Sequence, residues 1–230
     1  MVKNNEPLIE RRIKSPRSAA IAGIAYSILM ITGMILTASI SQTKPENITR
    51  DMLESWSRTS TIVITMIPFA GIAFLWFTGV IRDRLGEMED QFFTTIFLTS
   101  GTILVVLLFL WGAVFGAIMG TRAIATVGLV DEDMYVFGFA LMNEIIGNYI
   151  LRMAGVYMSA INTLWTKTGL MPRWLTIVTY ILALGFLLGA ERFREARFIF
   201  PAWVFVVSVY ILILNYRRTH NQESEHILEV

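Results

Sequence analysis

The chain has no cysteine, only two histidines and few charged residues for its length. Without cysteine there is no disulfide, no thiolate nucleophile and no cysteine-ligated metal. Both histidines, His220 and His226, lie close to the C-terminus, which excludes a His-ligated haem, an HExxH zinc site or a Ser/His/Asp triad from the rest of the chain. We therefore expect no catalytic residue, no cofactor and no metal site, and a protein that is not an enzyme.

The scarcity of charge indicates the class of protein. Charged residues make up 16% of the 230 residues and hydrophobic residues 55%, with a mean hydropathy of +0.59. A soluble domain typically has about 25% charged residues. The formal net charge of +1 gives no reason to expect nucleic acid as a partner. The composition is that of an integral membrane protein, with the lipid bilayer as its first partner.

The charged residues are bunched, and six long runs between the bunches are almost free of charge. A helix needs about 20 mostly apolar residues to cross a bilayer. A transmembrane β-barrel would instead show alternating segments of about ten residues. We predict an all-α polytopic membrane helix bundle with six transmembrane helices in one membrane domain, residues 18–216, and the fifth run is the shortest. The predicted spans are 18–40, 59–81, 92–119, 134–165, 174–190 and 198–216.

The distribution of Lys and Arg predicts the orientation of the bundle, because cytoplasmic loops carry an excess of these residues. With the N-terminus inside, eleven basic residues are cytoplasmic and seven are external. The spans are then N-in and C-in, in the cell membrane. Residues 1–17 and 217–230 become cytoplasmic tails, and we expect the polar C-terminal tail to be disordered. The cytoplasmic set is Lys3, Arg11, Arg12, Lys14, Arg17, Arg82, Arg84, Lys167, Arg173, Arg217 and Arg218; the external set is Lys44, Arg50, Arg58, Arg122, Arg192, Arg194 and Arg197.

Small residues recur at every fourth position in two spans. Helices in lipid associate through close approach of their backbones, for which small residues are suited. The third span ends with Gly112, Gly116 and Gly120 on one face, and the first has Ala19, Gly23 and Ser27 at the same spacing. We interpret both sets as helix-packing faces, although glycines at this spacing also line pores.

The fourth span carries polar residues through its middle. Glu144, Asn148, Arg152, Ser159 and Asn162 fall within one sector of about 80° when 100° is allowed per residue. A charge at a helix centre adds roughly 2.5–3.5 kcal/mol to the cost of insertion. We therefore expect the stripe to face the bundle interior and the apolar side of the helix to face lipid or neighbouring helices. Because helix side chains lean toward the N-terminus, we expect Arg152 to reach back to Asn148 and Asn148 to join Glu144.

Two stretches in the C-terminal third resemble a known group of proteins. They are "LWTKTGLMPRWLTIVTY" at 164–180 and "FPAWVFVVSVYILI" at 200–213. They are similar to uncharacterised multi-span integral membrane proteins of prokaryotes, in which a basic residue, a Gly and then Pro-Arg-Trp-Leu introduce a late span. The resemblance implies a prokaryotic membrane protein and carries over no functional residue.

The stripe leaves two functions open. In the first, the protein moves a small solute or ion, or senses a ligand, at the polar stripe of the fourth span. In the second, it is a scaffold or accessory subunit whose glycine faces bind another membrane protein or a second copy of the chain. A membrane enzyme is a distant third. The stripe also has a purely structural interpretation, in which its polar groups only fix the register of the helix.

Overall fold

The computed structural model describes residues 6–41, 50–85, 91–124, 132–169, 171–189, 193 and 195–228, and this part of the chain is helical without a strand. The prediction of an all-α protein is therefore confirmed over these residues. The elements are α1 (Glu6–Ser41), α2 (Arg50–Leu85), α3 (Gln91–Ile124), α4 (Glu132–Glu144), the π-helical segment η3 (Ile145–Ile150), α5 (Leu151–Thr168), α6 (Arg173–Leu188) and α7 (Ala196–Leu228).

Four of the helices are long and apolar enough to cross a membrane. Their apolar stretches are Ser18–Ala38 in α1, Ser55–Arg82 in α2, Gln91–Gly120 in α3 and Ala196–Tyr216 in α7. The predicted fourth span is helical but is divided into α4, η3 and α5, and the predicted fifth span, α6, has only 16 residues. The chain is thus membrane-embedded, with four candidate spanning helices among the described residues. The prediction of a disordered C-terminal tail is wrong, because α7 continues to Leu228.

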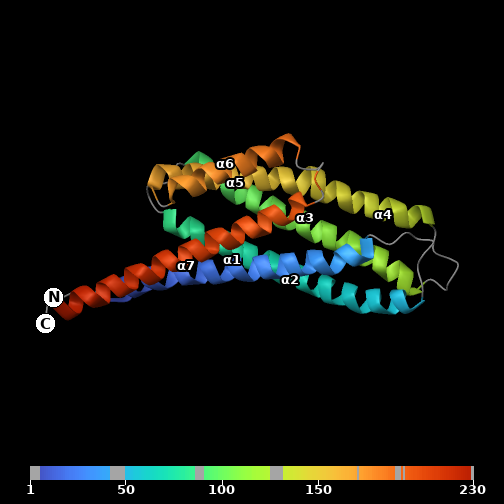
Figure 1. Cartoon of the computed structure of the whole chain (residues 1–230), viewed down its shortest axis with the longest axis horizontal. Helices are drawn as coiled ribbons and strands as arrows, with labels where there is room; N and C mark the ends of the chain where they lie inside the picture. Colours follow the sequence, from blue (N-terminus) through green and yellow to red (C-terminus); the bar gives the residue numbers. More distant parts are fainter. Residues whose placement is uncertain are drawn as a thin grey trace.

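The helices form a bundle in which neighbours along the chain are mostly neighbours in space (Figure 1). α1 packs between α7 and α2, α2 packs on α3, and α3 packs on α4, η3 and α5. α5 in turn contacts α6 and α7. The first turns of α1 and the last turns of α7 project from the same end of the bundle (Figure 1).

The connection between α5 and α6 is specified by a glycine and a proline. Gly169 ends α5 with φ +66°, a left-handed conformation that glycine adopts without steric cost. Pro172 then precedes α6 in an extended conformation, and its carbonyl accepts the amide protons of Leu175 and Thr176 at 3.0 and 3.2 Å. A backbone turn this short requires α6 to run back along α5.

Aromatic side chains fill the centre of the bundle around Tyr157, which is fully buried. Its ring centroid lies 4.8 Å from that of Phe97, 5.2 Å from Phe74 and 6.0 Å from Phe200. Its hydroxyl shares a 3.0 Å hydrogen bond with the hydroxyl of Thr78. Tyr157 therefore links α5 to α2, α3 and α7, and its polar atom is satisfied inside an apolar core, as burial requires.

The tightest surroundings of any described glycine are at Gly23, where α1 meets α2 and α7. A methyl group at this position would overlap Oγ of Ser208 and lie 2.7 Å from Cδ2 of Phe77. Ala19 and Ser27, at the same spacing on α1, are both 0% exposed. This face of α1 is thus occupied by helices of the same chain.

Candidate functional site

The polar residues at the start of the predicted stripe form a hydrogen-bonded ladder. Nδ2 of Asn148 donates to Oε1 of Glu144, and Nη1 of Arg152 donates to Oδ1 of Asn148. Nη1 of Arg152 also donates to the carbonyl oxygen of Asn148 at 3.0 Å. The bridging role predicted for Asn148 is confirmed. We call Glu144, Asn148 and Arg152 the polar ladder.

The prediction that this part of the stripe faces the bundle interior is wrong. Glu144 is exposed and Asn148 and Arg152 are half-buried. By contrast, Met142, Ile145 and Leu151 are 5%, 4% and 2% exposed. The physical reason is that the helix presents its apolar side to α3, so the polar side points away from the core.

The short length of α6 leaves the polar ladder uncovered. α6 packs on α5 up to Gly155, where an added Cβ would lie 2.9 Å from the carbonyl oxygen of Ala183 and 3.0 Å from Cγ of Leu187. α6 ends one residue later, at Leu188. Asn148 lies about 10 Å and Glu144 about 16 Å further along the helix, at ~1.5 Å per residue. Figure 1 shows the end of α6 well short of the start of α4.

The rest of the stripe lies under α6. Asn162 is 0% exposed, and its Nδ2 donates to the carbonyl oxygen of Thr176 at 2.9 Å. The carbonyl of the half-buried Ser159 accepts the hydroxyl of Thr163 at 2.9 Å, and Thr163 shares a 3.0 Å hydrogen bond with the hydroxyl of Tyr180. The five predicted site residues are therefore divided between a partly exposed ladder and the contact between α5 and α6.

The π-helical segment η3 lies within the polar ladder. It begins after Glu144 and ends before Leu151, whose amide donates to the carbonyl of Ile146 five residues back. π-helical turns are rare and occur frequently at functional sites. Its polar side carries Asn148, and its other side presents Ile146 and Ile150 to a cavity. The segment thus separates the polar ladder from an apolar space inside the bundle.

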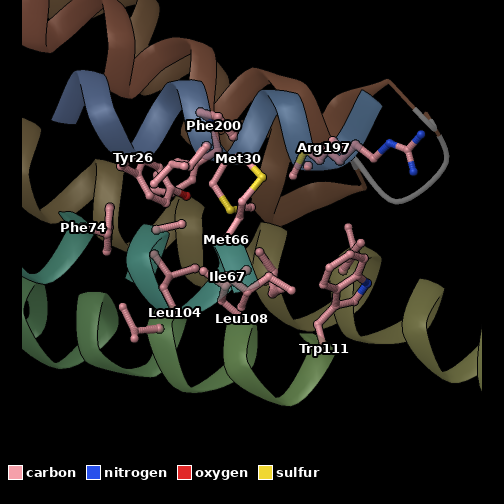
Figure 2. A pocket seen from close by; sticks show the side chains of 18 of the residues that line it. Tyr26, Met30, Met66, Ile67, Phe74, Leu104, Leu108, Trp111, Arg197 and Phe200 are labelled. Atoms are coloured by element: carbon pink, nitrogen blue, oxygen red, sulfur yellow. The ribbon is translucent and has the colours of Figure 1, made fainter. Parts of the chain in front are cut away.

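The cavity lies between α1, α2, α3, η3 and the starts of α5 and α7, and we call it the central cavity (Figure 2). Its volume is about 60 Å³, several times the ~10–15 Å³ that one buried water needs. Half-buried side chains line part of it, among them Met30, Met66 and Arg197, so the cavity reaches the bundle surface. The other lining residues include Leu29, Met34, Val63, Ile67, Ala70, Leu104, Val105, Leu108 and Leu151.

The two ends of the central cavity differ in polarity. Tyr26 and Phe74 lie at one end, and Trp111 and Arg197 lie at the other (Figure 2). Arg197 is the second residue of α7, so this end is close to where that span begins. Its guanidinium carbon lies 5.2 Å from the ring centroid of Phe198. The cavity therefore changes from aromatic and aliphatic at its inner end to polar at the end of the bundle.

The glycines of α3 do not share one environment. A Cβ on Gly112 would lie 2.8 Å from Cδ1 of Ile67, and one on Gly116 would lie 3.5 Å from Cδ1 of Ile64. Gly120 is exposed, with no atom within 4 Å of such a Cβ. α2 and α3 therefore diverge along this face, and only its first glycine is at a close contact.

The central cavity was not predictable from the sequence, because most of its lining residues are the leucine, methionine and valine typical of any apolar span. The one informative residue is Gly33, at which a Cβ would have no neighbour within 4 Å although it lines the cavity. Within the described residues, no three His, Cys, Asp or Glu side chains come together in a way that suits a metal ion. What the site can do chemically is to enclose an apolar group.

Comparison with known protein families, with curated proteins and with solved structures finds no match to this chain.

Proposed function

We propose that the protein is a multi-pass membrane protein that binds a lipid-like molecule, with the chain of that molecule in the central cavity. The observation that carries the proposal is the length and apolar lining of the cavity. The lining runs from Tyr26 to Thr37 on α1 and from Val63 to Phe74 on α2, about 16 Å on each helix at ~1.5 Å per residue. That is close to half of the ~30 Å hydrocarbon core, which is the depth of one leaflet.

The lining chemistry supports an apolar chain over a polar solute. Arg197 is the one formally charged residue among the described lining residues, and a water-filled path for ions needs more polar groups than this. Met30, Met34 and Met66 provide flexible side chains that adapt to an irregular ligand. The polar ladder lies outside the cavity, so transport along the stripe is less well supported than ligand binding.

We further propose six spans, with α4, η3 and α5 together as the fourth and α6 as the fifth. An even number of spans is supported by the start of α1 and the end of α7, which lie at one end of the bundle (Figure 1). The excess of basic residues in the tails supports N-in and C-in and the cell membrane as the location.

A leucine at Gly33 tests the binding proposal. The Gly33→Leu variant extends a side chain into the cavity from a position where a Cβ meets nothing, and leucine favours the helix more than glycine does. We expect the variant to fold and to lose saturable binding of tritiated dodecanol in phosphatidylcholine nanodiscs. Gly79→Leu is the matched control, because Gly79 is exposed, has equally open space and lies outside the cavity lining.

The proposal fails if the wild-type chain shows no saturable binding of dodecanol. It also fails if Gly33→Leu and Gly79→Leu bind the probe equally well, since the ligand would then lie elsewhere on the protein.

A further inference from the structure

We infer that the ligand of the central cavity is an amphiphile with an anionic oxygen headgroup, held at the end of the cavity formed by Trp111 and Arg197. This inference rests on the proposed function, because it assigns the head of the molecule whose chain fills the cavity. It is carried by two polar side chains at one end of a mostly apolar space.

The first is Trp111 on α3. The residue is 8% exposed and lines the cavity, and within the described chain its buried indole nitrogen has no hydrogen-bond partner. An indole N–H is a donor only, and a buried donor without an acceptor destabilises the protein because it has lost its hydrogen bond to water. A ligand that places an oxygen acceptor beside Trp111 removes this cost, whereas a pure hydrocarbon does not.

The second is Arg197 at the start of α7. The residue is half-buried and lines the same cavity. Arginine is permanently charged and binds carboxylate or phosphate oxygens through paired N–H groups. The charge therefore favours an anionic headgroup over a neutral one and disfavours a cationic one.

The position of these two residues agrees with the geometry of a lipid in a bilayer. Arg197 lies at the start of the apolar stretch Ala196–Tyr216, so it is at the level where a span meets the headgroups. Tyr26 and Phe74 lie at the opposite end of the cavity (Figure 2), with their ring centroids 4.8 Å apart. A single chain entering beside Arg197 would end against these rings.

Three probes with the same chain and different heads test the inference: dodecanoate, dodecanol and dodecyltrimethylammonium. The full chain in phosphatidylcholine nanodiscs at pH 8 is titrated with each probe against tritiated dodecanol. We expect dodecanoate to compete best and the cationic probe worst. Charge-assisted hydrogen bonds of about 1.5–3 kcal/mol convert to roughly a tenfold to hundredfold preference for dodecanoate over dodecanol.

Substitutions at the two residues separate their roles. Arg197→Gln should remove most of the preference for dodecanoate while dodecanol still binds, and Arg197→Lys should restore part of it. Trp111→Phe keeps an aromatic ring and removes the N–H, so it should lower the affinity for dodecanoate about 2-fold to 10-fold. If Arg197→Gln does not fold, Arg197→Lys and Trp111→Phe decide the result.

Two negative outcomes are distinguishable. If none of the probes binds, the proposed function fails and the inference fails with it. If all three bind equally and neither Trp111→Phe nor any folded Arg197 variant changes their ranking, the headgroup assignment is overturned while chain binding stands.

Discussion

Two glycines of α1 should respond in opposite directions to the same substitution. Gly23 lies where α1 meets α2 and α7, and a methyl group there would overlap Oγ of Ser208 and approach Cδ2 of Phe77 to 2.7 Å. Gly33 lies ten residues later on the same helix, and a methyl group there would meet nothing within 4 Å. Substituting alanine at each position therefore compares a tightly packed position, Gly23, with one that has space for the added methyl group, Gly33.

The magnitude follows from two terms. Replacing glycine by alanine inside a helix favours folding by about 1 kcal/mol, and this term applies to both positions. Overpacking a tight contact costs about 1–3 kcal/mol, and this term applies only to Gly23. The shared term cancels in the difference, so the free energy of unfolding of Gly33→Ala should exceed that of Gly23→Ala by about 1–3 kcal/mol.

The assay is equilibrium unfolding of each purified variant in dodecylmaltoside micelles by added sodium dodecyl sulfate, followed by circular dichroism. Ser208→Ala provides a second-site control, because it removes the hydroxyl oxygen that the new methyl group would overlap. Combined with Gly23→Ala it should restore part of the lost stability. Equal changes in Gly23→Ala and Gly33→Ala would refute the packing of α1 against α7 described here.

Two further predictions concern hydrogen bonds. Tyr157→Phe and Thr78→Val each remove one partner of the buried 3.0 Å hydrogen bond. A double-mutant cycle of unfolding free energies should therefore give a coupling energy of about 0.6 kcal/mol, which is typical of hydrogen bonds between membrane helices. A coupling energy of zero would contradict this hydrogen bond. Asn148→Leu removes the bridge between Glu144 and Arg152. In nanodiscs, Arg152 should then be labelled more readily by phenylglyoxal, which reacts with arginine. Unchanged labelling of Arg152 would contradict the polar ladder.

Part of this arrangement was predictable from the sequence. The spacing of Glu144, Asn148 and Arg152 predicted the polar ladder, because residues four apart on a helix are always neighbours. The four candidate spans followed from apolar runs that are long enough on their own to cross a bilayer. These features depend on local sequence, so tertiary packing has little influence on them.

The direction of the polar ladder was not predictable in the same way. An amphipathic helix has two sides, and which one faces the core depends on the neighbours that reach it. α3 covers the side with Leu151, while α6 ends at Leu188 before it reaches Asn148. The length of α6 therefore determines the environment of residues in another helix. The pattern of residues 134–165 alone cannot predict this.

The π-helical segment and the central cavity were missed for different reasons. The residues of η3, "IIGNYI", carry no motif that distinguishes a π-helical turn from an α-helical one. The cavity is a space left where the side chains of six elements do not meet. Gly33 contributes by its missing side chain, but the sequence contains 16 glycines and only the structure distinguishes this one.

The shortness of α6 has a consequence for the lipid around it. Its 16 residues are about 24 Å long, roughly 6 Å less than the hydrocarbon thickness of an average bilayer. Hydrophobic mismatch of this kind is relieved when the surrounding lipid becomes thinner, at a cost of fractions of a kcal/mol per Å. If α6 is the proposed fifth span, the bilayer beside it thins toward the protein, and water and headgroups come closer to Asn148 and Arg152.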